Sequence, residues 1–127
     1  MPITCRFRAE GDLLIVEASG RDDGLEDVHR YGMAILAKAA SLRTTRILCD
    51  ERALDYDLDI SATFESARLL AGALAQHVPG CARAALVPSP RYLSEARFWS
   101  TVAVHRGLTI RAFAELEDAR AWLAEEA

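Results

Sequence analysis

The apolar residues of this chain alternate between two spacings, and this alternation limits the folds that the chain can adopt. Segments with the two-residue period of a half-buried strand are interleaved with segments that have the 3.6-residue period of a helix. The strand-like segments are 3–9, 13–19, 46–50, 82–87 and 108–113, and the helical segments are 25–39, 64–78, 90–107 and 115–126. A helix between two strands of one sheet joins them in parallel with a right-handed crossover. The order therefore predicts an α/β fold with a mixed five-stranded sheet.

The first two strand-like segments have no helix between them. Only Glu10-Gly11-Asp12 separates them, and a connection this short joins antiparallel strands as a hairpin. We therefore expect segment 3–9 to be antiparallel and to lie at an edge of the sheet. The unbroken apolar run Ile47-Leu48-Cys49 is instead typical of a central strand that is covered on both faces.

Two of the predicted helices begin at recognisable capping signals. Asp23 and Glu26 have the spacing of a capping box, in which two side chains accept hydrogen bonds from free backbone amides. Ser89 is followed by Pro90, and a proline at the first helical position loses no hydrogen bond. Helices are therefore predicted to start at these two points.

Length, charge and cysteine content narrow the class of protein. The chain of 127 residues suits a single domain, residues 1–127, and its net charge of −4 with 15 dispersed basic residues gives no sign of nucleic-acid binding. Cys5, Cys49 and Cys81 are too few and too scattered for a disulfide framework or a zinc site. No stretch resembles a signal peptide or reaches the roughly 20 apolar residues of a membrane span. We expect a cytoplasmic protein with reduced thiols, no cofactor, no metal and no membrane association.

Four segments together resemble the SpoIIAA-like group, which includes STAS domains and anti-sigma-factor antagonists, and in particular its small single-domain bacterial members. These segments are ITCRFRAEGDLLIVEASG, ILCDE, RFWSTVAVHRGLTIRAF and AFAELEDARAWL, and they span nearly the whole chain. The resemblance implies a sheet of strand order 1-2-3-4-5. It also implies a role in protein–protein regulation or ligand sensing, without general catalytic machinery.

The chain departs from the STAS antagonists at one motif. Those proteins carry a phosphorylatable serine in an Asp-Ser-Ser type motif after the third strand, whereas here Asp50 is followed by Glu51 and Arg52. The first serine after this point is Ser61, at a predicted helix start. Ser61 is therefore the candidate phosphorylation site, and the resemblance does not carry the phosphoserine switch to positions 51 and 52.

The acidic stretch after the third strand lies where ligands collect in open α/β sheets, beyond the carboxyl end of a parallel strand. Asp55, Asp57 and Asp59 alternate without the glycine and distal glutamate of a calcium loop, so a metal site is not favoured. Helix capping by Asp59 or Ser61, with the other acids solvated, is the structural interpretation. Asp50 is the exception, because a carboxylate at a strand end can be partly buried and have a raised pKa.

A second loop follows the fourth strand at the equivalent position. Its Ser89, Arg91 and Tyr92 are predicted to face Asp50 and Glu51 across a cleft, and these five residues are the candidate ligand-binding set. An arginine–carboxylate pair that ties the two loops together is favoured over an anion site, although Ser89 at a helix N-terminus would suit a phosphate or carboxylate.

Nucleophilic catalysis has little support, and no catalytic residue is predicted. Ser89 lacks the G-x-S-x-G elbow, and none of His29, His77 and His105 lies at a strand end. Trp99 occurs at helical spacing and is predicted to belong to the core.

The reverse face of the sheet is predicted to mix arginines with apolar residues. With three right-handed crossovers in the order 1-2-3-4-5, the helices gather on one face and leave the other uncovered, unless a helix wraps around. Such a face either is solvated or binds a partner, most simply a second copy of the chain. We expect a homodimer, with the interface residues Arg6, Leu48, Arg83, Val87, Arg111 and Phe113.

Two functions of different classes follow. The first is a non-catalytic regulatory or ligand-sensing domain that acts through protein contacts, including a regulatory protein partner. The second is a small-molecule carrier or enzyme that uses the cleft between the loops after the third and fourth strands. The related CRAL-TRIO lipid-transfer fold extends the second to an apolar ligand, although this chain is short for enclosing a lipid. A deep apolar pocket with convergent polar groups at the carboxyl ends of the strands would favour ligand binding, and a shallow surface there would favour a contact module.

Overall fold

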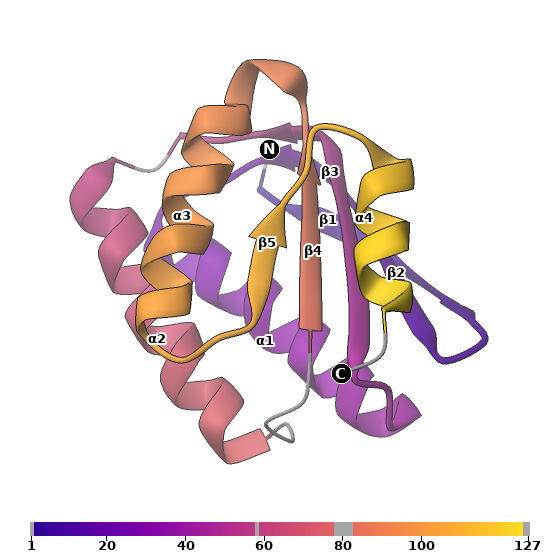
Figure 1. The fold of residues 1–127 in the computed structure, drawn as a ribbon. Coiled ribbons are helices and arrows are strands. Elements are labelled where there is room, and N and C mark those ends of the chain that lie inside the picture. Colours follow the sequence, from indigo (N-terminus) through magenta and orange to yellow (C-terminus); the bar gives the residue numbers. More distant parts are fainter. Residues whose placement is uncertain (1, 58, 78–82, 126–127) are drawn as a thin grey trace.

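The structure is a computed structural model that describes residues 2–57, 59–77 and 83–125. In this part of the chain five strands form one sheet of order β1-β2-β3-β4-β5, with β1 antiparallel to β2 and the other neighbours parallel (Figure 1). The strands are β1 Thr4–Glu10, β2 Leu13–Arg21, β3 Arg46–Asp55, β4 Arg83–Pro88 and β5 Ile110–Ala112. The predicted α/β fold, the mixed sheet and the strand order implied by the resemblance are confirmed.

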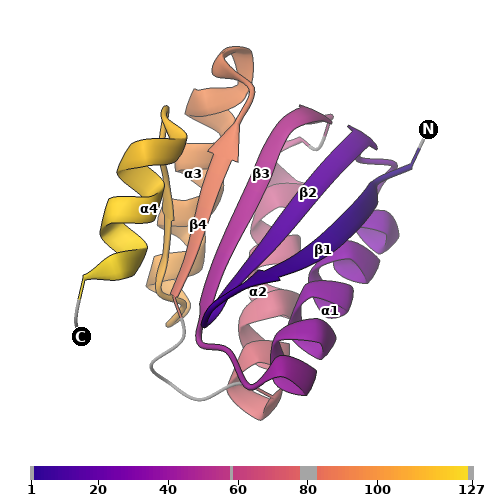
Figure 2. The same cartoon turned by 90° about the vertical axis from the view of Figure 1, so that its right-hand side faces the viewer.

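The helices of the described residues lie on both sides of the sheet. They are α1 Leu25–Leu42, α2 Ile60–His77, the short 3-10 helix η1 Pro90–Tyr92, α3 Leu93–His105 and α4 Leu116–Ala124. The first three α-helices are on one side, and α4 lies on the other (Figure 2). After the edge strand β5 the chain therefore passes to the opposite face of the sheet, where α4 packs (Figure 2).

Strand β3 is longer than predicted, and this changes the surroundings of the acidic residues. The sequence predicted a strand that ends at Asp50, but β3 continues to Asp55 because residues 53–55 pair with residues 19–21 of β2. Asp50, Glu51 and Asp55 therefore belong to a strand rather than to a loop. Neighbouring strand residues point to opposite faces of a sheet, so neighbouring acids here have different surroundings.

The side of the sheet that faces α1, α2 and α3 holds the larger apolar core. Leu14 and Val16 of β2 are completely buried there, together with Ile47 and Cys49 of β3. Helix α1 contributes the stripe that its sequence predicted, including Ile35. Burial of each large apolar side chain contributes about 1.5–3 kcal/mol relative to exposure.

The other side is not the uncovered surface that we expected. Leu48 and Val87 have exposed fractions of 1% and 0%, because they pack beneath Ala119 and Leu123 of α4. The prediction that these two residues belong to an exposed interface is therefore wrong. Phe113 is partly buried against the same cluster. The physical reason is that α4 has an apolar stripe of its own. Packing this stripe on the sheet removes the apolar surfaces of both the helix and the sheet from water.

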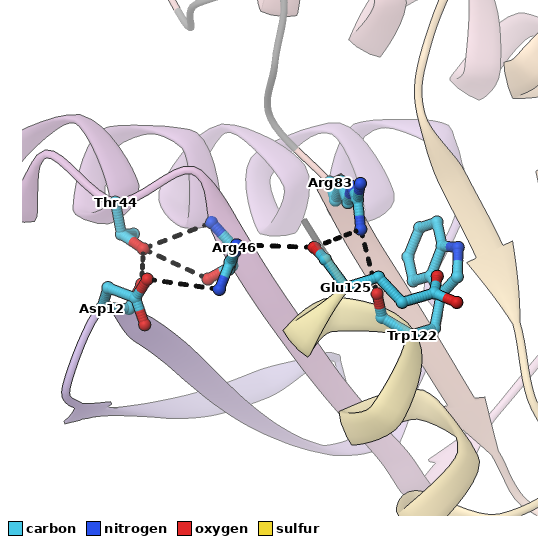
Figure 3. A network of polar contacts seen from close by, with 6 residues as sticks. All are labelled: Asp12, Thr44, Arg46, Arg83, Trp122 and Glu125. Atoms are coloured by element: carbon cyan, nitrogen blue, oxygen red, sulfur yellow. Dashed lines mark hydrogen bonds and ion pairs between the residues drawn. The ribbon is translucent and has the colours of Figure 1, made fainter. Parts of the chain in front are cut away.

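Two arginines, Arg46 of β3 and Arg83 of β4, hold the end of α4 (Figure 3). Arg83 donates hydrogen bonds of 3.0 Å to the backbone carbonyls of Trp122 and Glu125, and Arg46 donates a 3.5 Å bond to the Glu125 carbonyl. Arg46 also forms a 3.5 Å ion pair with Asp12. Basic groups are favourable at a helix C-terminus because they satisfy its last carbonyls and complement its dipole. Arg83 thus serves an intrachain role that the interface prediction did not foresee.

The start of α1 differs from the predicted capping box. Gly24 is the N-cap residue, with φ of 86°, and no side chain caps it. Instead the Asp27 carboxylate accepts hydrogen bonds of 2.9 Å from the Asp23 amide and 3.0 Å from the Ile3 amide. The bond from Ile3 explains why Asp27 takes the place of the predicted Glu26. It connects the helix to the residue before β1, whereas Glu26 lies on the exposed side of the helix.

Candidate ligand-binding cavity

A cavity of about 400 Å³ lies between the sheet and the helices α1, α2 and α3. Its walls are mainly apolar and come from all three helices and from the strands β3, β4 and β5. They include Val28, Ile35, Ile47, Leu70, Leu86 and Trp99. Small-molecule sites are typically apolar cavities of roughly 300–1,000 Å³ with a few convergent polar groups. The cavity has the apolar walls and polar groups predicted to favour ligand binding, but it lies between the sheet and the helices, and its Glu51 end is the part near the carboxyl end of β3.

Helix α2 is held over the cavity by its two neighbouring helices. A Cβ atom added to Gly32 of α1 would lie 2.3 Å from Leu70 Cδ2, so any larger residue at position 32 would force the Leu70 side chain of α2 to move. On the other side, the Trp99 indole of α3 donates a 2.7 Å hydrogen bond to the Ser66 hydroxyl of α2. These contacts fix the helix that closes the cavity.

Glu51 forms the centre of the polar end of the cavity. Its side chain lines the cavity although the residue is only 5% exposed. The Tyr31 hydroxyl of α1 donates a 2.7 Å hydrogen bond to Glu51 Oε2, and the Tyr56 hydroxyl donates a second bond to Oε1. Both tyrosines also line the cavity. A carboxyl group with two phenol donors is thus built into an otherwise apolar wall.

An irregularity in the sheet occurs at Glu51. Asp50 pairs with Glu17 and Ala53 pairs with Ser19, so two residues of β3 lie opposite the single residue Ala18 of β2. Bulges of this kind bend a strand and redirect side chains, and they are frequent beside functional sites. Glu51 and Arg52 are the two residues of this bulge, and the Glu51 side chain points toward the helices.

The surroundings of Glu51 raise the pKa of its carboxyl group. Burial raises the pKa of the carboxyl group, the hydrogen bonds from Tyr56 and Tyr31 oppose this effect, and the negative charges of Asp22 and Asp50 raise the pKa further. Within the described part of the chain, no lysine, arginine or histidine lies at ion-pair distance from Glu51. A buried carboxyl group without a cationic partner is costly to ionise.

The loops after β3 and β4 meet through two aromatic rings. Tyr56 stacks on Tyr92 with 5.3 Å between ring centroids, and the Tyr92 hydroxyl donates a 3.2 Å hydrogen bond to Asp55. The predicted contact between the two loops therefore exists, but aromatic stacking makes it. Tyr92 reaches Glu51 only indirectly, because Tyr56 lies between them.

Asp50 does not belong to the cavity. Its carboxylate accepts two 2.8 Å hydrogen bonds from the guanidinium of Arg52, and both residues line a separate surface groove beside β1 and β2. The side-chain hydrogen bonds from Arg52 lower the pKa of Asp50, with burial opposing them. The predicted raised pKa is therefore wrong for Asp50, and the raised value belongs to its neighbour Glu51.

Ser89 and Arg91 also lie differently from the prediction. Ser89 precedes η1 with Pro90 at the first position, as expected, but its hydroxyl makes no capping bond. Arg91 is exposed and lies over the Tyr92 ring, 5.2 Å from its centroid. Asp50 pairs with Arg52 rather than with Arg91, so the predicted arginine–carboxylate bridge between the loops does not form.

The remaining acids follow the structural interpretation. Asp59 Oδ1 accepts a 2.8 Å hydrogen bond from the Ala62 amide and thereby caps α2, and Asp57 forms an exposed 3.0 Å ion pair with Arg21. Ser61 is exposed in the first turn of α2, and its phosphorylation stays a prediction. Across the described ranges no group of three or more histidine, cysteine or acidic side chains is arranged to hold a metal ion.

The cysteines show no feature of a nucleophile. Burial raises the pKa of Cys5, and Cys49 is buried with its pKa well above the ordinary range. Reactive cysteines need the opposite shift. Cys81 lies outside the described residues.

Sequence reasoning missed Tyr31 and Tyr56 and treated Trp99 only as core. A usable signal for Glu51 existed, because Ile47, Cys49 and residue 51 alternate onto the same face of β3. A glutamate that continues a buried face needs partners, and phenols on neighbouring elements are suitable ones. The helical position of Tyr31, directly before Gly32 and on the buried stripe, was consistent with such a role.

The helices of the described residues include none with the length and apolar character needed to cross a bilayer. No protein-family model matches the chain, and no curated protein matches it. The crystal structure of an anti-sigma factor antagonist from Mycobacterium paratuberculosis is similar to it, with a TM-score of 0.59 and 14% sequence identity. The match covers 97% of this chain and 95% of that chain. The chain therefore has the SpoIIAA-like fold.

Proposed function

We propose that this protein is a non-catalytic regulatory domain that binds a small, largely apolar molecule in the cavity beneath α1, α2 and α3. The observation that carries the proposal is the cavity itself, with about 400 Å³ of space, apolar walls and the buried Glu51 at its polar end. Burial of apolar ligand surface supplies the affinity, and the few polar groups supply orientation.

The chemistry of the polar groups supports binding rather than catalysis. Both oxygens of Glu51 accept phenol hydrogen bonds, and the adjacent Cys49 thiol has a raised pKa because it is buried. Burial and the negative charge of Glu51 also raise the pKa of Tyr31 well above its ordinary value. A thiol and a phenol whose pKa values lie above their ordinary ranges stay protonated at physiological pH and are poor nucleophiles and bases.

A protein partner completes the proposal, supported by the fold that the chain shares with an anti-sigma factor antagonist. The bulge in β3 offers a direct route from the cavity to the surface. Glu51 points into the cavity, whereas Asp50 and Arg52 line an exposed groove with Arg6 of β1 and Glu17 of β2. A ligand that moves Glu51 would therefore also move two charged groups that a partner can contact.

Thermal unfolding with a neutral apolar probe tests the binding step. We expect 1-naphthylmethanol to stabilise the protein, by about 2.7 kcal/mol at 100 times its Kd. Val28→Trp should abolish this effect because Val28 lines the cavity. Ala121→Trp on the exposed side of α4 is the matched control and should retain it. A wild-type protein that ignores this and other neutral probes of similar size would refute the proposed function.

The route to the surface has its own test. Amide hydrogen exchange of residues 50–52 should slow when the neutral probe binds, because the bulge loses freedom of movement. Exchange in β1 residues far from the bulge, such as Ala9, should stay unchanged. Equal rates with and without bound probe would leave ligand binding in place and remove the proposed coupling.

A further inference from the structure

The charged residues described along the cavity wall are mostly acidic. Among the described residues that line it, four are acidic, namely Asp22, Glu51, Asp59 and Glu95, and one is basic, Arg83. The Arg83 guanidinium is engaged on the other face of the sheet, where it donates to the Trp122 and Glu125 carbonyls. Among the described lining residues, the acidic side chains thus outnumber the basic ones, and this excess disfavours an anionic ligand.

The polar end also has an imbalance between donors and acceptors. The hydroxyl protons of Tyr31 and Tyr56 are both committed to Glu51. A carboxylate has about four acceptor positions, and a phenol oxygen can still accept after donating its proton. Two phenols therefore leave acceptor capacity on Glu51 and on their own oxygens. The group that this end can receive is a hydrogen-bond donor.

Resting on the proposed function above, we infer that the ligand of this cavity is an amine, an apolar molecule whose ammonium group pairs with Glu51. The ammonium supplies three donors to a site that offers acceptors, and it provides the counter-ion that Glu51 lacks among the described residues. The apolar body of the ligand occupies the space lined by Ile47, Leu70 and Trp99.

Two further features fit a cation at this position. The hydroxyl oxygens of Tyr31 and Tyr56 lie beside Glu51 and both residues line the cavity, so these oxygens can accept further hydrogen bonds from the ammonium group. Burial raises the pKa of Glu51 in the empty cavity, and a bound ammonium opposes this shift because an adjacent positive charge stabilises the carboxylate. Amine binding and ionisation of Glu51 are thus coupled.

Three probes with the same aromatic skeleton test this inference by calorimetric titration of the full chain at pH 7. They are 1-naphthylmethylamine, 1-naphthylmethanol and 1-naphthylacetic acid, which differ in charge at one end. We expect the amine to bind at least about ten-fold more tightly than the alcohol, equivalent to about 1.4 kcal/mol, and the acid to bind weakest. An amine that binds no more tightly than the alcohol would overturn the inference while leaving the proposed function in place.

Substitutions then assign the preference to Glu51. Glu51→Gln keeps the shape and one acceptor oxygen but removes the charge, so the amine-to-alcohol ratio should fall to within about two-fold. Asp50→Asn removes the neighbouring charge, which faces the other side of the sheet, and should leave the ratio unchanged. A ten-fold preference that persists in Glu51→Gln would contradict the assignment. If Glu51→Gln does not fold, the comparison of the three probes on the wild-type chain still decides whether the cavity prefers an amine.

Failure of all three probes to bind would instead refute the proposed function.

Discussion

The hydroxyl of Tyr31 on α1 donates a 2.7 Å hydrogen bond to Oε2 of Glu51 on β3. Tyr31 has an exposed fraction of 8% and Glu51 of 5%, so this bond joins helix and sheet in the protein interior. Polar pairs in such surroundings are worth most when both partners are present, because removal of one leaves the other buried and unsatisfied. The pair therefore connects the stability of the fold to the integrity of the candidate site.

Tyr31→Phe should reduce the free energy of unfolding by about 1–3 kcal/mol, because it removes a buried donor and leaves Glu51 with one phenol. Urea denaturation at pH 7 measures the effect. Tyr92→Phe is the matched control, since its hydrogen bond to Asp55 is exposed and should contribute well below 1 kcal/mol. Equal losses in the two variants would show that the buried bond has no special role.

Glu51 should make the wild-type protein less stable as pH rises. Its pKa in the fold lies above the ordinary value of 4.5, so the folded state binds more protons than the unfolded state between these two pKa values. Stability therefore falls as pH increases through that interval and then levels off above the folded-state pKa. Glu51→Gln cannot ionise, so its stability relative to wild type should improve from pH 4.5 to pH 8. Urea denaturation at several pH values measures this difference, and a constant difference would contradict the raised pKa.

The fold was predictable because local pattern and topology agree along most of the chain. The alternation of Ile47, Leu48 and Cys49 assigned the two faces of β3 correctly, and the short Glu10-Gly11-Asp12 connection placed β1 at an edge. The position of α4 was harder to predict, because three right-handed crossovers determine where α1, α2 and α3 lie but do not constrain a helix that follows the last strand.

The candidate site was predicted only in part, for reasons that concern long-range contacts. Glu51 and Tyr92 were in the predicted set, but Asp50 is directed to the opposite face by strand alternation and pairs with Arg52. The bulge beside Glu51 depends on the register between β2 and β3, and no local pattern encodes a register shift. Tyr31 lies 20 positions from Glu51 in the chain, so only the folded arrangement brings them together.

Asp27 should have the opposite pH dependence to Glu51. Burial alone would raise its pKa, but hydrogen bonds from the Ile3 and Asp23 amides and from Arg30 lower it below the ordinary value of 3.8. A lowered pKa contributes stability that is present above pH 3.8 and is lost as pH falls through the folded-state pKa.

Asp27→Asn should therefore cost about 1–3 kcal/mol of unfolding free energy at pH 7, and the difference from wild type should shrink below about pH 4. Urea denaturation at pH 7 and at acidic pH measures both values. Glu65→Gln is the control, because the Glu65–Arg68 pair is exposed and contributes little. A deficit that stays constant down to low pH would mean that Asp27 acts by packing and not by charge.

Phe113→Asp tests whether the reverse face of the sheet serves to pack α4 or to form a homodimer. Homodimer formation stays a prediction, but Leu48 and Val87 are buried by α4, which leaves Phe113 as the partly exposed apolar residue of the predicted interface. Its ring packs within the chain against Trp122, at 5.6 Å between centroids, and Arg111 lies over it at 5.2 Å. We therefore expect Phe113→Asp to lower the unfolding free energy by about 1–3 kcal/mol, because it removes part of the α4 contact, and to leave the mass in solution unchanged. Light scattering at micromolar concentration distinguishes the 13.9 kDa chain from a dimer. A dimeric wild type that this substitution converts to a monomer would restore the interface to this face of the sheet.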